Sequence, residues 1–121
     1  KIIPSADHAS IQQALNYIHT HFNEPLTLQE LSEIVHLNTS YFSSLFKQSV
    51  GVNFLQYLTN YRMKEAKKLL LEHNYSIGEI SIRVGYKTSK YFIQIFKEYE
   101  KITPNQYRKQ KHSKDNGVYP K

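Results

Sequence analysis

Two short stretches of the chain gather small hydroxyl, amide and lysine side chains, with no carboxylate among them until Glu98. The first stretch offers Asn38, Thr39, Ser40, Ser43, Ser44, Lys47 and Gln48, and the second offers Lys87, Thr88, Ser89, Lys90, Ile93, Gln94 and Lys97. Hydroxyls and lysines can bind phosphate oxygens or guanine edges, and glutamine can bond adenine. One such face alone is more simply explained as solvated helix surface, but the same pattern twice favours nucleic-acid binding.

The two stretches belong to a sequence repeat. "LTLQELSEIVHLNTSYFSSLFKQSVGVNFLQY" (26–57) aligns with "YSIGEISIRVGYKTSKYFIQIFKEYEKITPNQY" (75–107), at an offset of 49 before Lys90 and of 50 after it. Two copies are too few for a solenoid, which needs about three or more repeats to bury a continuous core. The repeat therefore predicts a pair of similar modules.

Each copy predicts two short helices joined by a tight turn. "TLQE" and "SIGE" are capping boxes, in which Thr27 and Ser76 cap helices of about nine residues and Glu30 and Glu79 reach back to the cap amides. As helix N-termini favour anions, Thr27 and Ser76 are also candidate phosphate contacts. Gly85 can supply a left-handed turn, and His36 stands in that place in the first copy.

The second helix of each copy is expected at about 39–49 and 89–100. The apolar positions predict buried faces made by Tyr41, Phe42, Leu45 and Phe46 in the first copy, and by Tyr91, Phe92, Ile95 and Phe96 in the second. Two helices around a tight turn, given twice, form a helix-turn-helix pattern given twice.

Three further helices complete the prediction. Ser10 caps a leading helix, Asn53 caps a long helix, and Thr103 with Pro104 opens a last one. The apolar stripe of the long helix is Leu55, Leu58, Ala66, Leu69 and Leu70. We therefore expect an all-α fold of seven helices without a strand. The expected organisation is a linker from a missing N-terminal region (1–9), a first module (10–52), a connecting helix (53–73), a second module (74–110) and a disordered tail (111–121).

Composition bounds the class of protein. The 121 residues include no cysteine, and no apolar run approaches the ~18–20 residues of a membrane span. The net charge of +6 is uneven, with a balance of −2 over residues 1–50 and +8 over 51–121. A basic, aromatic-rich chain suggests a polyanionic partner such as nucleic acid or an anionic membrane surface, although a lysine surplus also serves solubility. The absence of cysteine suits the cytoplasm.

Catalytic and metal chemistry have little support in the sequence. No nucleophile–base pair follows from spacing, and four glycines form no phosphate-binding loop. Among the six histidines, His19 and His21 are two apart and point to different helix faces. We therefore predict no catalytic residue, no metal site and no cofactor. Arg62, within an apolar stripe, is expected to form a structural ion pair, with Glu79 as one candidate partner.

Five motifs resemble the DNA-binding domain of the AraC/XylS family of bacterial transcription regulators. They are "YFSSLFK", "YRMKEAKKLL", "SIGEISIRVGY", "YFIQIFK" and "ITPNQYRK", and the resemblance covers about residues 10–110. It implies two helix-turn-helix subdomains, a homeodomain-like pair, bridged by the long central helix. The third and sixth helices would be recognition helices in successive major grooves, roughly 34 Å apart, a separation that the central helix would set.

Carried over by position, the resemblance assigns roles to the two faces. Base-reading positions fall on Ser40, Ser43 and Ser44, and on Ser89, Lys90, Ile93 and Gln94, while phosphate contacts fall on Thr39, Lys47, Lys87, Thr88 and Lys97. Many members have Arg where this chain has Ser44 and Gln94, so direct readout by the first helix should be weak, with more reliance on DNA shape. Ile93 could instead touch a thymine methyl.

Two departures from the family pattern are structural. Ser81 stands where the family usually has Ala, and Lys101 where it usually has Gly. If Lys101 adopts a positive φ, the strain should cost roughly 1 kcal/mol.

The resemblance also implies partners. The expected partners are promoter DNA, RNA polymerase and a missing N-terminal receiver, sensor or effector-binding domain. The whole regulator would be a cytoplasmic activator, and its isolated DNA-binding domain would be monomeric. The alternative is a helical protein-interaction module that uses the same faces on an acidic partner. Substitution Lys90→Glu would weaken both kinds of binding, whereas dependence on base sequence separates them.

Overall fold

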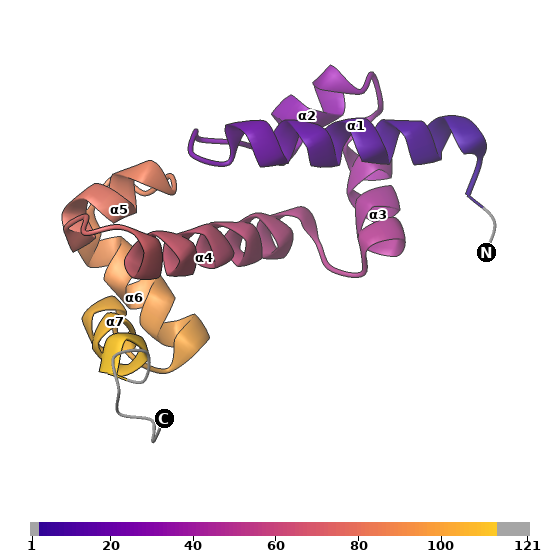
Figure 1. Cartoon of the computed structure of the whole chain (residues 1–121). Helices are drawn as coiled ribbons and strands as arrows, with labels where there is room; N and C mark the ends of the chain where they lie inside the picture. Colours follow the sequence, from indigo (N-terminus) through magenta and orange to yellow (C-terminus); the bar gives the residue numbers. More distant parts are fainter. Residues whose placement is uncertain (1–2, 114–121) are drawn as a thin grey trace. The chain divides into compact units, whose positions relative to one another are not determined.

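The computed structural model describes residues 3–113, and every regular element among them is a helix (Figure 1). The helices in chain order are α1 (Ser5–His21), α2 (Leu28–Ile34), α3 (Thr39–Val50), α4 (Phe54–Glu72), α5 (Ile77–Arg83), α6 (Ser89–Glu100) and α7 (Pro104–Ser113). The predicted all-α fold of seven helices is therefore confirmed over the described residues. The chain divides into two compact units, and the boundary between Tyr61 and Arg62 falls within α4.

Both ends of the predicted architecture need correction. Helix α1 begins after Pro4, and Ser10 lies inside it, with its hydroxyl donating to the Ala6 carbonyl at 3.1 Å. The predicted Ser10 cap is wrong, and residues 5–9 are helical rather than linker, because alanines and an acidic residue in the first turn support an earlier start. Helix α7 continues through residues 111–113, which we predicted to be disordered. The rest of that predicted tail lies outside the described residues.

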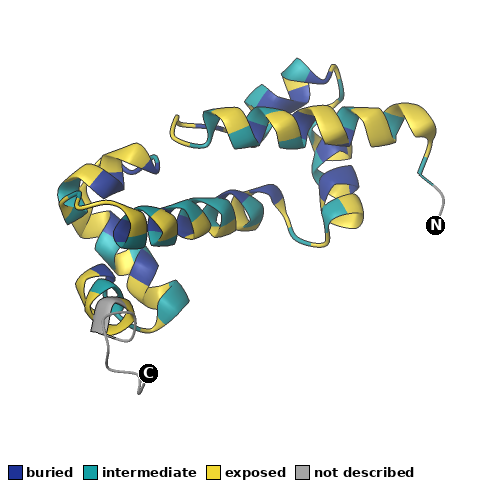
Figure 2. Ribbon diagram, viewed as in Figure 1, coloured by how far each residue is buried: buried dark blue, intermediate teal, exposed yellow. Residues whose placement is uncertain are grey.

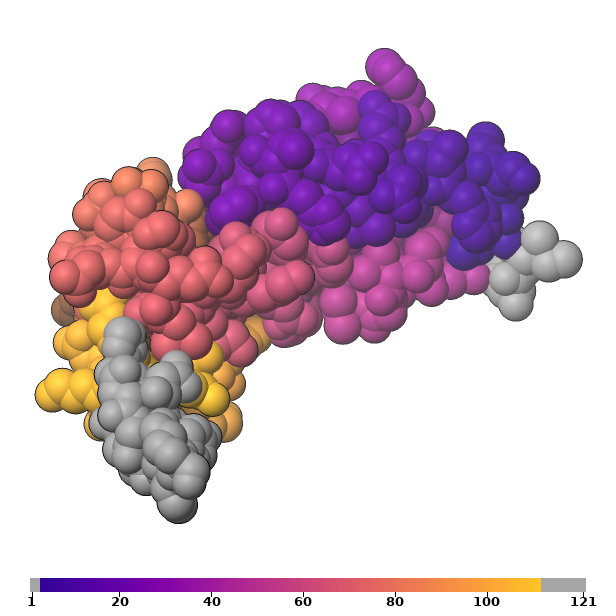
Figure 3. Space-filling view, in the orientation of Figure 1, coloured from indigo at the N-terminus to yellow at the C-terminus, as the bar shows by residue number. Residues whose placement is uncertain are grey.

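The first unit has one apolar core, enclosed by α1, α2, α3 and the start of α4. Its centre is Phe46, whose ring meets Phe42 edge-on at 5.9 Å between centroids and Tyr57 at 5.8 Å. The buried set around it is Ile11, Ala14, Ile18, Leu26, Leu31, Val35, Leu45, Phe54 and Leu58. Figure 2 shows buried and exposed residues on the same helices, as amphipathic helices require. In Figure 3, α1 forms much of the visible face of this unit.

The second unit repeats this packing. Phe96 meets Phe92 at 5.8 Å and Tyr107 of α7 at 5.6 Å. The other large buried residues are Met63, Leu70, Ile80, Val84, Tyr86 and Pro104. Arg108 of α7 donates to the carbonyls of Leu70 at 3.0 Å and Tyr75 at 2.7 Å. It thereby holds the C-terminal end of α4, where the last carbonyls lack helical partners.

The turns of the two units match, as the repeat predicted. His36 and Gly85 both have positive φ, at 60° and 104°, in the tight turns after α2 and α5. Gly85 is needed for a second reason, since a Cβ there would lie 2.8 Å from the Arg62 guanidinium. Gly51 and Lys101 close α3 and α6 in the left-handed region, at φ 98° and 71°. Lys101 therefore adopts the positive φ on which the expected strain depends.

Three predicted core residues lie at the surface. Tyr41 is 47% exposed, Tyr91 50% and Leu55 68%. The two tyrosines flank a stripe that the buried phenylalanines already fill. In α4 the inward residue is Phe54, so the true stripe starts one position before the predicted one. The prediction of these three as buried is wrong.

The left-handed residues that end α3 and α6, Gly51 and Lys101, give a stability test in which each position serves as the control for the other. Substitution Lys101→Gly should raise the free energy of unfolding by about 1 kcal/mol, because glycine adopts positive φ without steric cost. The exposed bond from Lys101 Nζ to the Glu98 carbonyl, at 3.3 Å, is a weak offset. Urea unfolding followed by circular dichroism measures the change.

The matched variant is Gly51→Lys, at the equivalent position in the first unit. No atom lies within 4 Å of a Cβ built there, so any loss of stability reports backbone strain alone. It should lower the free energy of unfolding by about 1 kcal/mol or more. A Lys101→Gly protein no more stable than the parent would contradict the account of this turn.

Candidate nucleic-acid interface

The first predicted recognition helix, α3, is held with its polar side outward. Phe42, Leu45 and Phe46 are buried on one side, which leaves Ser40, Ser44 and Lys47 exposed on the other. Asn38 caps the helix, since its side-chain oxygen accepts from the Tyr41 amide at 3.1 Å. Asn38 is exposed, so its amide nitrogen can still face a ligand while the oxygen is used. Ser43 is half-buried.

Thr39 is less available than the sequence predicted. Its hydroxyl lies 2.8 Å from the hydroxyl of the buried Ser32 of α2, which also lies 2.7 Å from the Gln29 carbonyl. A phosphate contact by Thr39 would have to compete with or share this bond. In the second unit, the buried Ser81 donates to the Gly78 carbonyl at 2.7 Å, which explains how a serine is accepted at this position.

The second predicted recognition helix, α6, repeats the arrangement. Thr88 caps it, with its hydroxyl accepting from the Tyr91 amide at 3.1 Å. With Phe92 and Phe96 fully buried, the outward residues are Lys87, Thr88, Ser89, Lys90, Gln94 and Lys97, and all are exposed. The structure therefore brings these predicted residues together on one helix and its N-terminal turn.

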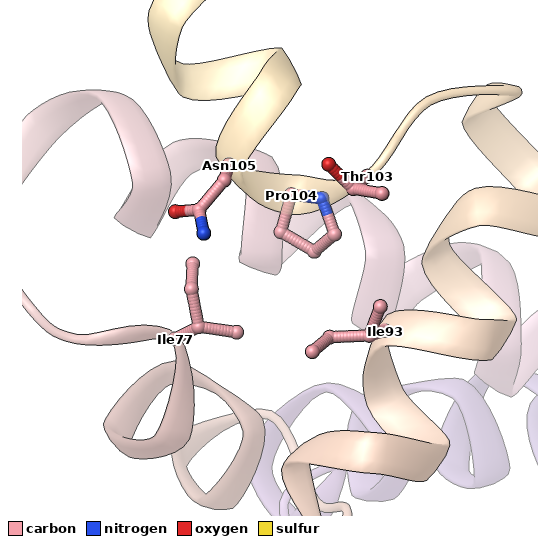
Figure 4. A pocket seen from close by; sticks show the side chains of 5 residues that line it. All are labelled: Ile77, Ile93, Thr103, Pro104 and Asn105. Atoms are coloured by element: carbon pink, nitrogen blue, oxygen red, sulfur yellow. The ribbon is translucent and has the colours of Figure 1, made fainter.

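Ile93 departs from the prediction of an exposed position. It is half-buried and lines a hollow of about 170 Å³ with Ile77, Thr103, Pro104 and Asn105 (Figure 4). These residues come from the starts of α5 and α7, so the Ile93 side chain faces its own unit as well as solvent. The prediction that Ile93 takes no part in packing is wrong.

The two caps of the preceding helices form as predicted, but only in part. The exposed hydroxyls of Thr27 and Ser76 accept from the amides of Glu30 at 3.0 Å and Glu79 at 3.1 Å. The carboxylates do not complete the boxes in the described hydrogen bonds. Glu30 accepts from the Tyr17 hydroxyl at 3.5 Å, and Glu79 pairs with Arg83 at 2.9 Å. An anion at these N-termini would therefore meet a nearby carboxylate in both units.

Arg62 is held by an aromatic ring, and the predicted pairing with Glu79 is wrong because Glu79 pairs with Arg83. The guanidinium carbon lies 5.1 Å from the Tyr86 ring centroid, and the two side chains are hydrogen-bonded. Burial lowers the pKa of Arg62, and the Tyr86 side chain opposes that shift. Burial likewise raises the pKa of Tyr86, and Arg62 opposes it. Arg62 thus contributes to the core of the second unit.

Comparison with known proteins identifies the family. A family model described as a helix-turn-helix domain matches residues 31–110, which include both predicted recognition helices. The chain belongs to this family, in its AraC-type branch. An uncharacterized HTH-type transcriptional regulator of Bacillus subtilis, YtdP, is 40% identical over 99 residues, covering 82% of this chain and 13% of YtdP.

Two solved structures resemble this AraC-type chain over most of its length. The C-terminal domain of AraT, a response regulator from Geobacillus stearothermophilus, is 39% identical with a TM-score of 0.81, covering 84% of each chain. The DNA-binding domain of AdpA, solved with a target DNA, has a TM-score of 0.83 at 21% identity, covering 87% of this chain and 95% of that one. At that identity AdpA supports the fold alone. The chain spans 13% to 37% of the length of the first curated relatives it matches.

Two features of this AraC-type chain were not predicted from its sequence. Tyr41 and Tyr91 are large aromatic residues on the exposed side of the recognition helices. Each tyrosine lies next to an apolar stripe that is complete without it, and this position could have indicated its exposure. The other feature is a reciprocal cap at α7, where the Thr103 amide donates to Gln106 Oε1 at 2.9 Å and the Gln106 amide donates to Thr103 Oγ1 at 3.1 Å. The spacing T-x-x-Q carries that signal.

Other kinds of site lack support in the described part of the chain. None of the helices within residues 3–113 combines the length and apolar character that a membrane-spanning helix needs. The same residues include no group of three or more histidine or carboxylate side chains placed to hold a metal ion.

The cap of α6 gives a test of the structural role of Thr88. Substitution Thr88→Ala should lower the free energy of unfolding by about 1 kcal/mol, because the Tyr91 amide loses its acceptor. Substitution Thr88→Asp should leave stability near that of the parent, because aspartate caps well and its charge suits a helix N-terminus. Thermal unfolding of the two variants checks this, and equal losses for both would show that the cap bond contributes nothing.

Proposed function

We propose that the chain is the sequence-specific DNA-binding domain of a bacterial transcription regulator, in which α3 and α6 each enter a major groove, the two grooves being successive. The observation that carries the proposal is the repeated face. In each unit a pair of phenylalanines buries one side of the helix, α3 or α6, in the core. The opposite side exposes hydroxyls, amides and lysines to solvent. A helix that reads base edges needs this combination of rigid seating and donor-rich surface.

The exposed residues take different parts in this proposal. Ser40 and Ser44 of α3 and Ser89, Lys90 and Gln94 of α6 face bases. Lys47, Lys87 and Lys97 neutralise phosphates, with Asn38 and Thr88 as uncharged contacts at helix N-termini. Thr27 and Ser76 add weaker uncharged contacts, because the Glu30 and Glu79 carboxylates lie near their helix N-termini. Thr39, Ser43 and Ile93 are half-buried, so they contribute at the edges, Ile93 through its methyl groups. The first unit has one lysine on its helix, so it depends more on DNA shape.

The relatives support the wider setting. YtdP is named a transcriptional regulator, and AraT is named a response regulator. We infer that this chain binds promoter DNA in the cytoplasm as a monomeric, non-enzymatic module of a larger regulator. That regulator carries an N-terminal receiver, sensor or effector-binding domain and activates by recruiting RNA polymerase. Any catalytic turnover by the purified chain would oppose this proposal.

Selection from a random duplex library at two salt concentrations tests the proposal. We expect an enriched motif of two blocks about one helical turn apart, with the stronger block assigned to α6 by variants at Lys90 and Gln94. Salt-sensitive binding without a motif would replace base reading by phosphate binding alone. If the folded chain binds no duplex, the DNA proposal fails and an acidic protein partner becomes the better candidate.

The salt dependence of affinity tests the proposed contacts one at a time. Substitution Lys97→Ala should reduce the slope of log K against log salt by about 1, because one fewer phosphate charge is neutralised. Lys68, which pairs with Glu65 on α4 at 3.6 Å, is the matched control, and Lys68→Ala should leave the slope unchanged. Equal effects of the two variants would mean that net charge, rather than the α6 face, drives binding.

A further inference from the structure

The two exposed tyrosines occupy the same place in the two recognition helices but have different surroundings. Tyr41 and Tyr91 are each the third residue of their helix, and each amide is held by the capping side chain, Asn38 or Thr88. Each ring is about half exposed, at 47% and 50%. A tyrosine at this place presents a hydroxyl donor beside the polar face, where a DNA backbone would pass in the proposed function.

In the first unit the hydroxyl of Tyr41 already has an acidic hydrogen-bond partner. The Tyr41 hydroxyl donates to a carboxylate oxygen of Asp7, in the first turn of α1. The hydrogen bond to Asp7 is the main reason that the pKa of Tyr41 is raised, followed by burial and the carboxylate's charge. A carboxylate and a phosphate accept hydrogen bonds in the same way. Asp7 therefore takes the position on Tyr41 that a phosphate oxygen would take, and its charge opposes one nearby.

In the second unit the surroundings of the tyrosine are cationic. The Tyr91 ring packs edge-on against Tyr86 at 5.7 Å between centroids, and Tyr86 in turn lies under the Arg62 guanidinium at 5.1 Å. Arg62 also interacts electrostatically with Tyr91. Within residues 3–113, no carboxylate accepts the Tyr91 hydroxyl as Asp7 accepts that of Tyr41. Packing against Tyr86 fixes the Tyr91 ring, and the positive charge of Arg62 favours an anion at Tyr91.

We propose that Tyr91 donates a hydrogen bond to a DNA phosphate, whereas Asp7 holds the Tyr41 hydroxyl away from DNA and weakens the grip of the first unit. Lys90 and Lys97 of α6, with Lys87 just before that helix, act in the same direction, because α3 has Lys47 alone. The second unit then contributes most of the affinity for DNA, and Asp7 limits the affinity contributed by the first unit. The inference rests on the proposed DNA binding.

The test measures affinity for a random-sequence duplex, because a phosphate contact does not depend on sequence. Substitution Tyr91→Phe should weaken binding about fivefold, with an unchanged salt slope because the lost donor is uncharged. Substitution Tyr41→Phe, the matched control, should leave affinity within about twofold of the parent. Substitution Asp7→Asn should tighten binding about fivefold, and adding Tyr41→Phe to it should remove part of that gain. Circular dichroism melting confirms that each variant is folded.

The outcomes separate this inference from the proposed function. Equal effects of Tyr41→Phe and Tyr91→Phe, or an Asp7→Asn protein that binds no tighter, would overturn the inference. If the parent binds and Lys90→Ala weakens it while Tyr91→Phe does not, DNA binding stands and the role of Tyr91 falls. If the parent binds no duplex at all, the proposed function itself fails, and the inference with it.

Discussion

The burial of one phenylalanine pair in each unit determines what the chain can offer to a ligand. Phe42 and Phe46, like Phe92 and Phe96, are four residues apart and therefore share one side of a helix, and all four are fully buried. Truncating a buried phenylalanine to alanine typically costs about 3–5 kcal/mol, so the rotation of each helix about its axis is strongly specified. The opposite side must face solvent, and the donor-rich residues lie there. Caps and left-handed closures then set the length of each helix.

The repeat produces two similar folds with unequal surfaces. Caps, tight turns and phenylalanine pairs match between the units, because these features build a helix-turn-helix in either place. The outward residues were free to diverge, and they differ in charge. The first unit has a single lysine on its recognition helix, and its exposed tyrosine is bonded to a carboxylate. The second unit has two lysines on the helix and one just before it, and its exposed tyrosine packs against a tyrosine that carries an arginine on its ring. The proposed unequal engagement of DNA rests on this difference, since phosphate attraction supplies much of the affinity.

Local patterns predicted the fold well, and contacts between distant segments limited the rest. The helices could be predicted from apolar spacing and from the caps at Thr27, Asn53, Ser76 and Thr103, because both signals depend on residues within one helical turn. The tyrosines were assigned wrongly because a residue beside a 3.6-residue stripe can face either way until its neighbours are known. The Arg62–Tyr86 contact joins residues 24 apart, and no local pattern indicates it. The predicted faces of α3 and α6 are exposed apart from Thr39, Ser43 and Ile93, whose half-burial depends on α2, α5 and α7.

Amide chemical-shift mapping during titration of the isotope-labelled chain with a DNA duplex tests the central claim most directly. We expect the largest amide shifts along Lys90, Gln94 and Lys97 of α6, and smaller but distinct shifts along Ser40, Ser44 and Lys47 of α3. The amide signals of buried residues on the opposite sides of both helices should shift little. Shifts spread evenly over the basic surface, or confined to helices other than α3 and α6, would contradict the claim that these two faces bind DNA.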